Sequence, residues 1–184
     1  MVDQNLKHEN VIFQGKIFQI IQKSIHEKTF EIASRSPGVR LLIIDGDNIL
    51  LTKEYRHEYQ GYDYRLPWGK VFDTLTEFNK KLINNKYILP YAEIAAKKEC
   101  KEETWIIPKK LKHFHTSKAG TTVERDLYYF IVESFEHNKK GQELEEGEDI
   151  TIERKTKEEV KKLCIHGEMN EERSVAVLLR FLLQ

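Results

Sequence analysis

The sequence predicts a single domain that combines β-strands with α-helices. A chain of 184 residues is long enough for one domain with a substantial hydrophobic core. Two stretches, 11–21 and 39–52, are rich in β-branched and aromatic residues and are interrupted by turn-forming residues, which is typical of strands. Two others, 95–104 and 174–183, carry charged or apolar residues at helical spacing. These observations favour the α/β class.

Charge and composition exclude several classes of partner. The 30 basic and 30 acidic residues balance and are interspersed, so neither nucleic acid nor a membrane surface is an expected partner. No apolar run approaches a membrane span, and the N-terminus lacks the apolar core of a signal peptide. Cys100 and Cys164 have no metal-ligand spacing, so we expect buried thiols in a reducing compartment. A cytoplasmic protein is therefore expected.

The first third of the chain is predicted to be rich in strands. Residues 11–21 read as one or two strands broken near Gly15, and residues 24–33 as another alternating segment that offers apolar side chains to a core. Residues 39–52 are predicted to form a hairpin, because two β-rich runs flank the turn-forming quartet 45–48.

Aromatic residues and an amphipathic segment mark the middle of the chain. Five aromatic side chains occur within a short stretch: Tyr55, Tyr59, Tyr62, Tyr64 and Trp68. Such rings can stack on a nucleobase for about 1–3 kcal/mol, although sheet and core packing accounts for most of them. Residues 73–91 carry apolar side chains at helical spacing, from Leu75 to Ile83, and are predicted to form a short helix and a loop.

Three glutamates share one face of the next predicted helix. Glu99, Glu102 and Glu103 have the spacing i, i+3 and i+4, which places them on one face of a helix that starts near Pro90 and ends near Trp105. Like charges this close repel one another unless a cation or basic neighbours offset them, and Mg²⁺ prefers carboxylate oxygens. Two interpretations remain open here, a metal-binding helix and a solvated acidic stripe balanced by neighbouring lysines.

That face is expected to be bordered by small residues, with other positions of the helix facing a core. Ala95 and Ala96 lie on the carboxylate side one turn earlier, whereas Ile94 and Cys100 fall outside this sector and are the expected core residues.

The C-terminal half alternates strands with loops and ends in helices. Residues 111–115 and 126–135 are predicted strands, and the loop 116–124 between them contains Gly120 among hydroxyl groups, which suits either an anionic ligand or a plain hairpin. Residues 138–149 are predicted to form a polar, acidic loop. Thr156 then starts a helix with Glu159 at the capping-box position.

Several of these segments resemble the Nudix hydrolases, in the order that the family shows. Residues 98–106 resemble the second half of the Nudix box, and Leu66-Pro67-Trp68-Gly69-Lys70-Val71 resembles the run that opens the box in ADP-ribose pyrophosphatases. Residues 53–59, 116–124 and 146–150 resemble further segments of that branch. The box is divergent: Lys98 replaces an Arg, Trp105 replaces a Gly, Pro90 occupies the place of the first Glu, and residues 73–91 are an insertion.

The resemblance implies a Nudix-type α/β/α sandwich with a mixed sheet, plus N-terminal strands over residues 1–35 that help to form a homodimer. It implies Mg²⁺-dependent hydrolysis, with Mn²⁺ as a substitute, of a nucleoside diphosphate linked to another moiety, with ADP-ribose giving AMP and ribose 5-phosphate. The alternatives are a GDP-sugar or other nucleotide-sugar pyrophosphatase and a degenerate Nudix module that binds a nucleotide or a protein without hydrolysing it.

The resemblance also assigns roles to individual residues. The metal ligands are expected to be Glu99, Glu102, Glu103 and the backbone carbonyl of Trp68. The general base is expected to be Glu146 or, failing that, Glu148. Candidate substrate-binding residues are Arg56, Gly69, Gly120, Thr121 and Glu124.

Overall fold

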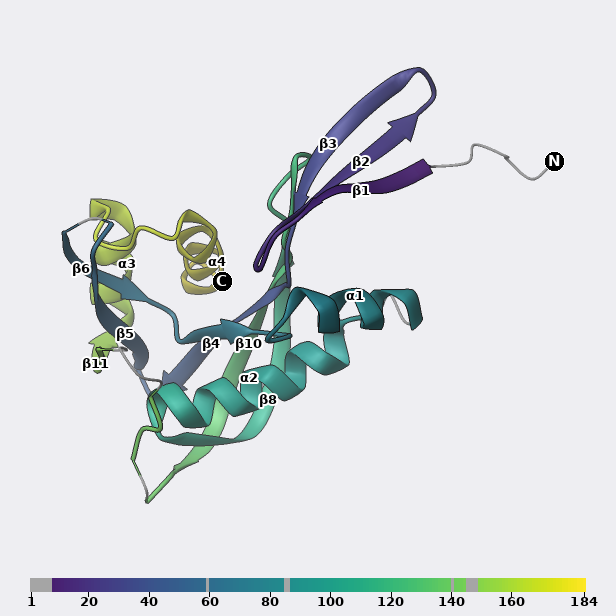
Figure 1. The fold of residues 1–184 in the computed structure, drawn as a ribbon. Helices are drawn as coiled ribbons and strands as arrows, with labels where there is room; N and C mark the ends of the chain where they lie inside the picture. The colour runs from purple at the N-terminus through teal and green to yellow at the C-terminus, as the bar shows by residue number, and fades with distance from the viewer. Residues whose placement is uncertain (1–7, 59, 85–86, 140, 145–148) are drawn as a thin grey trace.

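The computed structural model describes residues 8–58, 60–84, 87–139, 141–144 and 149–184 (Figure 1). The strands are β1 (His8–Gln14), β2 (Gln19–Ile25), β3 (Lys28–Ser34), β4 (Gly38–Asp45), β5 (Asn48–Arg56), β6 (Gly61–Arg65), β7 (Trp68–Lys70), β8 (Ile106–Ser117), β9 (Val123–Glu124), β10 (Leu127–His137) and β11 (Ile150–Thr156). The helices are α1 (Leu75–Asn84), α2 (Leu89–Thr104), α3 (Lys157–His166) and α4 (Glu172–Leu182).

The larger of the two sheets is mixed and forms the middle layer of the molecule. Its strand order is β11-β5-β4-β10-β8, with β6 beside β5 and β7 beside β4. Strands β4 and β10 are parallel, whereas the other pairs are antiparallel. The hairpin predicted over residues 39–52 is confirmed, because Ile43 pairs with Leu50 and Asp45 with Asn48.

The central strands are buried on both faces, which fixes the layers above and below them. Along β4, Leu41 and Ile43 belong to the core that packs under α1 and α2, whereas Leu42 belongs to the core under α3 and α4. Strand β10 alternates in the same way, with Phe130 on the first face and Tyr129 on the second. Helices therefore cover both faces of a mixed sheet, which confirms the expected sandwich (Figure 1).

Helix α2 begins and ends as predicted, but its buried face differs from the expectation. Pro90 lies in its first turn and Trp105 caps its C-terminus. Ala95 and Ala96 are buried in the core and do not border an open acidic face, and Cys100 joins them there. Ile94 was the wrong choice for a core residue, since 67% of it is exposed. The carboxylates face β7 at one margin of the buried stripe, so the small alanines allow close helix–sheet packing.

Trp105 adopts a backbone conformation that is usually reserved for glycine. Its backbone adopts the left-handed conformation, with φ at +48° and ψ at 25°, directly after the last helical residue, Thr104. A non-glycine residue adopts this conformation at a cost of about 1–2 kcal/mol. The indole is half-buried against the core, which offsets part of that cost. The exit of the helix is therefore the one that glycine usually provides.

The segment 73–91 contains the short helix predicted for it. In α1, Leu75 and Phe78 are buried in the core, whereas Ile83 is 85% exposed. The side chains of Asn79 and Gln19 exchange two hydrogen bonds, at 3.2 and 2.9 Å, and thereby tie α1 to β2. The insertion is thus anchored to the core and to the N-terminal strands.

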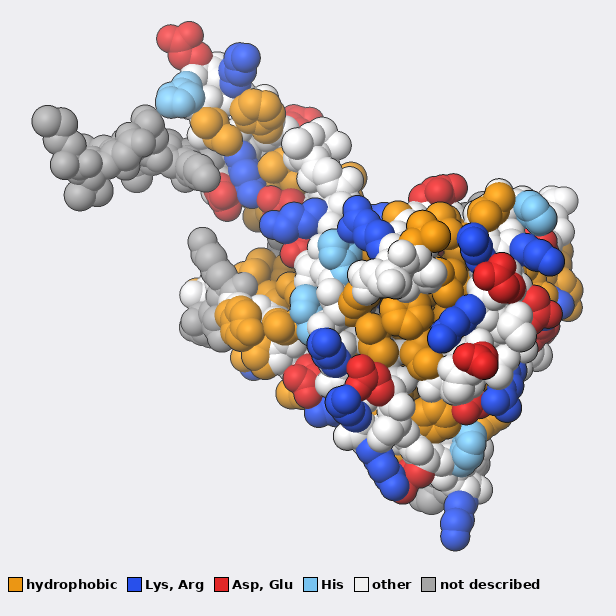
Figure 2. Space-filling model, turned by 180° about the vertical axis from the view of Figure 1, so that it is seen from behind, with side chains coloured by type: hydrophobic (Ala, Val, Ile, Leu, Met, Phe, Trp, Pro, Cys, Tyr) orange, Lys and Arg blue, Asp and Glu red, His pale blue; other side chains and the backbone are white. Residues whose placement is uncertain are grey.

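The N-terminal strands form a separate sheet with the order β1-β2-β3-β9, which projects from the body of the molecule (Figure 1). The break near Gly15 separates β1 from β2 as predicted. Of the apolar residues expected to face a core, Ile32 is buried, but Ile25 and Phe30 are exposed. The space-filling view shows hydrophobic side chains among the charged ones on this projection (Figure 2).

The C-terminal helices follow the sequence closely. Thr156 and Glu159 form the predicted capping box, in which each side chain bonds the backbone N–H of the other. Gly167 ends α3 in the left-handed conformation, with φ at +75°. Within the described residues, no helix combines the length and the apolar character that crossing a bilayer requires.

Candidate active site

Helix α2 and strand β7 enclose a small acidic hollow, which we call the carboxylate pocket. Its volume is about 50 Å³. The residues that line it are Trp68, Gly69, Lys70, Asp73, Lys98, Glu99, Glu102, Glu103 and Glu143. Three of the four predicted metal ligands are α2 glutamates and the fourth is Trp68, so the fold brings all four together, with Gly69 beside them.

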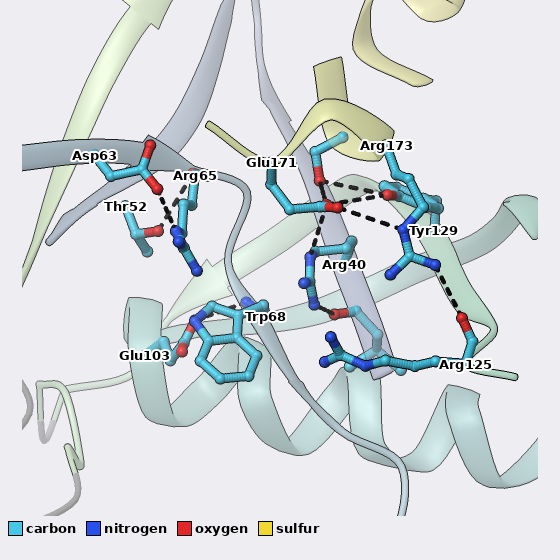
Figure 3. Close-up of polar contacts among 12 residues, drawn as sticks. Arg40, Thr52, Asp63, Arg65, Trp68, Glu103, Arg125, Tyr129, Glu171 and Arg173 are labelled. Carbon is cyan, nitrogen blue, oxygen red and sulfur yellow. Dashed lines mark hydrogen bonds and ion pairs between the residues drawn. The ribbon is translucent and has the colours of Figure 1, made fainter. Parts of the chain in front are cut away.

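Glu103 is the most deeply buried of these carboxylates. Glu103 is only 4% exposed. Its Oε2 accepts a hydrogen bond from the backbone N–H of Trp68 at 2.8 Å (Figure 3). A buried carboxylate needs such a donor, because loss of its water without a partner is costly. This bond fixes the end of α2 against the first residue of β7.

Gly69 is required by the position of Glu99. A β-carbon placed on Gly69 would lie 2.0 Å from Cδ of Glu99 and 2.1 Å from its Oε1. Such distances are far below van der Waals contact, so any larger residue would force the carboxylate of Glu99 away. The strand backbone therefore provides a cradle that only glycine leaves open.

The pKa of Lys98 reflects the negative charge of the pocket. Partial burial acts to lower its pKa, but the carboxylates of Glu102, Glu99 and Asp73 outweigh burial and raise the pKa of this lysine. The ammonium group forms an ion pair with Glu102 at 3.5 Å. Lys98 thus supplies positive charge at the rim of the pocket, next to Glu102.

The chemistry of the pocket fits a hard divalent cation, since its ligands are carboxylate and backbone oxygens. In the part of the chain that the structure describes, however, no three Asp, Glu, His or Cys side chains are grouped as a metal site. Two of the carboxylates have other partners, because Glu102 faces Lys98 and Glu103 bonds the amide of Trp68. A cation would have to compete with these contacts.

Comparisons with known proteins identify the fold and nothing finer. No protein-family model and no curated protein matches the sequence. Among solved structures, the crystal structure of an ADP compounds hydrolase matches with a TM-score of 0.67 over 96% of this chain and 89% of that chain, at 16% sequence identity. The chain has a Nudix-like fold. At this level of identity the likeness concerns the architecture alone.

Three of the predicted substrate-binding residues lie elsewhere in this Nudix-like fold. Gly120 and Glu124 line a larger cavity of about 360 Å³, beneath the N-terminal sheet, and Thr121 is an exposed residue of the same loop. Glu124 forms an ion pair with Lys23 of β2 at 2.6 Å. We call this the arginine cavity after the residues that line it: Ser34, Arg35, Pro37, Phe78, Leu82, Ile88, Lys118, Ala119, Gly120, Val123, Glu124, Arg125, Asp126 and Tyr128.

Arg56 occupies a third location in the Nudix-like fold. It forms ion pairs with Glu54 at 2.9 Å and with Glu58 at 2.8 Å, and it lines an open hollow together with Tyr55 and Tyr62. The predicted general bases lie outside the described residues. Glu143, the described glutamate of the same acidic segment, lines the carboxylate pocket, and its backbone N–H donates to the carbonyl of Glu102 at 2.9 Å.

Sequence reasoning missed a cluster of arginines beside the carboxylate pocket (Figure 3). Arg40 of β4 is only 5% exposed and lies over the ring of Trp68, with its guanidinium carbon 5.4 Å from the ring centre. Its Nε lies 3.6 Å from Glu171, which also faces Arg173 at 3.5 Å. The available signal was a single charge in the apolar run of β4, because arginine is rarely buried unless it is paired. Arg125 had no such signal.

Proposed function

We propose that this protein is a divalent-cation-dependent pyrophosphohydrolase that acts on a nucleoside diphosphate linked to a second moiety. The observation that carries the proposal is the arrangement of Glu99 and Glu103 against the backbone of Gly69 and Trp68, in a chain with a Nudix-like fold. Glycine at position 69 leaves room for one of these carboxylates, and the Trp68 amide holds the other. A merely solvated acidic stripe would need neither contact.

The residues of the carboxylate pocket are assigned to hold the cation and the reacting diphosphate. Bound Mg²⁺ or Mn²⁺ would neutralise the charge of the diphosphate and activate water. We assign Glu99, Glu102, Glu103 and the carbonyl of Trp68 as its ligands. The ion pair between Lys98 and Glu102 holds that carboxylate at the rim of the pocket.

The general base must be a carboxylate that does not coordinate the cation, because coordination lowers basicity. We assign this role to Glu146 first and Glu148 second. The base removes the proton as the oxygen of water bonds to phosphorus and the bond between phosphorus and the bridging oxygen breaks. Glu143, from the same acidic segment, already lines the pocket and forms an ion pair with Lys101 at 3.0 Å, which supports the assignment.

ADP-ribose is the first substrate that we propose, with AMP and ribose 5-phosphate as products. The resemblance of residues 66–71 to ADP-ribose pyrophosphatases supports it, as does the likeness to a structure named as an ADP compounds hydrolase. A GDP-sugar or another nucleotide sugar contains the same scissile diphosphate and is the alternative substrate class.

Local structure favours an active enzyme over a degenerate module. The loss of the box glycine is compensated, since Trp105 adopts the left-handed exit that glycine would provide. The replacement of the box arginine keeps a positive charge at Lys98 beside Glu102. The insertion leaves α2 and β7 in contact through Glu103 and Trp68.

A panel of nucleotide substrates tests the proposal. ADP-ribose, GDP-mannose and other nucleotide sugars are incubated with the protein in Mg²⁺, in Mn²⁺ or in EDTA, and released monophosphate is measured. We expect AMP from ADP-ribose with either cation and no release in EDTA. Absence of hydrolysis of every compound in both cations would contradict the proposal and favour the binding module.

We also propose that the protein is a homodimer that buries its projecting N-terminal sheet. Val11 and Phe13 of β1 and Phe18, which precedes β2, are exposed there, and clustered exposed apolar residues mark interaction surfaces. Light scattering after gel filtration should give twice the monomer mass. Substitution Phe13→Ser should shift the protein to the monomer, whereas Ile165→Ser, on the exposed face of α3, should not. A monomeric wild-type protein would exclude the dimer.

A further inference from the structure

Two guanidinium groups, those of Arg35 and Arg125, line the arginine cavity. Among the described residues, no carboxylate lies within 4.0 Å of the side chain of Arg35 or Arg125. The Nε atoms of both are buried and have no hydrogen-bond acceptor in the same part of the chain. The guanidinium carbon of Arg35 lies over the ring of Phe18, 5.0 Å from the ring centre. A buried donor of this kind is costly unless a ligand or water satisfies it.

The surroundings of Arg125 make its positive charge unfavourable without a ligand. Burial, followed by the nearby charges of Arg35, Arg40 and Arg173, lowers the pKa of Arg125 to about 10. Glu171 acts in the opposite direction but already faces Arg40 and Arg173. Packing positive groups together without matching carboxylates is the arrangement by which proteins recognise phosphate.

Two acidic residues also line the cavity, and they do not cancel this charge. Glu124 is engaged by Lys23 from outside the cavity, at 2.6 Å. Burial raises the pKa of Asp126, so its surroundings disfavour the charged form of this carboxyl group. Lys118 adds a further positive charge to the lining. The cavity thus presents more positive than negative charge to a ligand.

Part of the cavity lining is apolar, and the segment 73–91 provides most of this apolar wall. Phe78 and Leu82 come from α1, Ile88 directly precedes α2, and Tyr128 closes the wall from β10. A volume of about 360 Å³ is in the range of small-molecule sites, which run from about 300 to 1,000 Å³. A ligand that fits both walls has a flat apolar ring at one end and an anionic group at the other.

Gly38 connects this cavity to the carboxylate pocket. A β-carbon placed on Gly38 would lie 3.6 Å from Nη2 of Arg125 and 3.1 Å from the carbonyl oxygen of Gly69. Gly69 in turn lies against the side chain of Glu99 in the carboxylate pocket. The guanidinium of Arg125 therefore lies next to the strand backbone that borders the carboxylates, and one extended ligand could reach both regions.

We propose that the arginine cavity is a phosphate subsite that binds a mononucleotide group, with its phosphate on Arg125 and Arg35 and its base against the wall from α1. Its place in the reaction, as the subsite for one half of a diphosphate substrate, rests on the proposed function. The binding itself does not, because the arginines need no cation to attract phosphate.

Binding of 5′-AMP in EDTA, measured by calorimetry with adenosine as the matched ligand, tests this subsite. Wild-type protein should bind AMP more tightly than adenosine. Arg125→Leu should weaken AMP binding by about 10- to 100-fold, the worth of a charge-assisted hydrogen bond, and leave adenosine unchanged. Arg125→Lys should fall between them, because lysine keeps the charge but loses the planar fork.

Arg154→Leu is the control for net charge, because Arg154 lies on β11 in an ion pair with Asp45 and outside the cavity. It should bind AMP like the wild type. A thermal melt checks the fold: Arg125→Leu should melt no lower than the wild type, because the guanidinium forms no hydrogen bond or ion pair with the described residues and is buried among other positive charges. Failure of the wild type to bind AMP, equal affinity for AMP and adenosine, or equal effects of Arg125→Leu and Arg154→Leu would each overturn the proposal.

The proposed hydrolase activity and the proposed phosphate subsite can be refuted independently of each other. If no substrate in the panel is hydrolysed while AMP binding depends on Arg125, the subsite stands and the proposed hydrolase does not. If ADP-ribose is hydrolysed and Arg125→Leu changes neither its KM nor AMP binding, the hydrolase stands and the subsite does not.

Discussion

The carboxylate pocket and the arginine cavity are neighbours of opposite charge, built in different ways. The first is small, and most of its lining comes from one face of α2 and the adjacent β7. The second is larger and is assembled from the end of β3, the loop before β10, and α1. They meet at Gly38 and Gly69. A diphosphate compound with a cation at one end would find matching charge in both.

The two regions also differ in how far the protein satisfies their charges by itself. Glu102 has Lys98, and Glu103 has the amide of Trp68. Arg125 has no carboxylate partner among the described residues. A cation must therefore compete with protein contacts in the carboxylate pocket, whereas an anion entering the arginine cavity meets guanidinium groups that have no carboxylate partner in the described part of the chain. We therefore expect phosphate binding in the arginine cavity not to require the cation, so variants should separate the two functions.

The largest effect should come from the general base. Glu146→Gln should lower kcat by about 10²- to 10⁴-fold, because the amide cannot accept the proton of the attacking water. AMP affinity in EDTA should be unchanged, since the arginines supply it. Steady-state kinetics at saturating Mg²⁺ measure the first quantity and calorimetry the second. Glu158→Gln, an exposed residue of α3, is the control, and near-native kcat in both Glu146→Gln and Glu148→Gln would place the base elsewhere.

The next effect concerns the cation alone. Glu103→Gln keeps the size of the side chain but removes a negative charge from the pocket, so the Mg²⁺ concentration for half-maximal activity should rise by about tenfold or more. Activity is measured over a Mg²⁺ titration at fixed substrate. Glu93→Gln, on the exposed ion pair with Lys97 of the same helix, should leave the titration unchanged. An unaltered Mg²⁺ requirement in Glu103→Gln would remove Glu103 from the ligand set.

The same contrast explains what the sequence could predict. The glutamates of α2 are close in the chain, so helical spacing alone places them on one face, and the structure confirms this grouping against Trp68 and Gly69. The hairpin over 39–52 and the capping box at Thr156 are likewise local patterns, and both are confirmed. Local backbone chemistry is sufficient for features of this kind.

The arginine cavity could not be predicted, because its members come together only through tertiary packing. Arg35 and Arg125 are ninety residues apart in the chain, and the parallel pairing of β4 with β10 brings their segments together. The errors in α2 have a related cause. Ile94 is more apolar than Ala95 and Ala96, but close packing of α2 on the sheet admits only small side chains, so the alanines are buried. The hydrophobicity of the residues alone does not indicate how closely the helix packs on the sheet.

The smallest predicted effect tests whether the inserted helix belongs to the ligand site or only covers the core. Leu82 lines the arginine cavity, whereas the adjacent Ile83 is 85% exposed on the same helix. Replacement of either by alanine keeps helix propensity high, so the pair isolates the apolar contact. Leu82→Ala should weaken AMP binding by about fourfold, equivalent to one methylene contact of about 0.8 kcal/mol, and Ile83→Ala should not. The affinity for adenosine should fall by the same factor in Leu82→Ala, because this wall contacts the base and not the phosphate. The Mg²⁺ requirement should be unchanged, since neither residue lines the carboxylate pocket. Equal affinities in both variants would show that α1 only packs on the core, and a loss for AMP without a loss for adenosine would place the base against another wall.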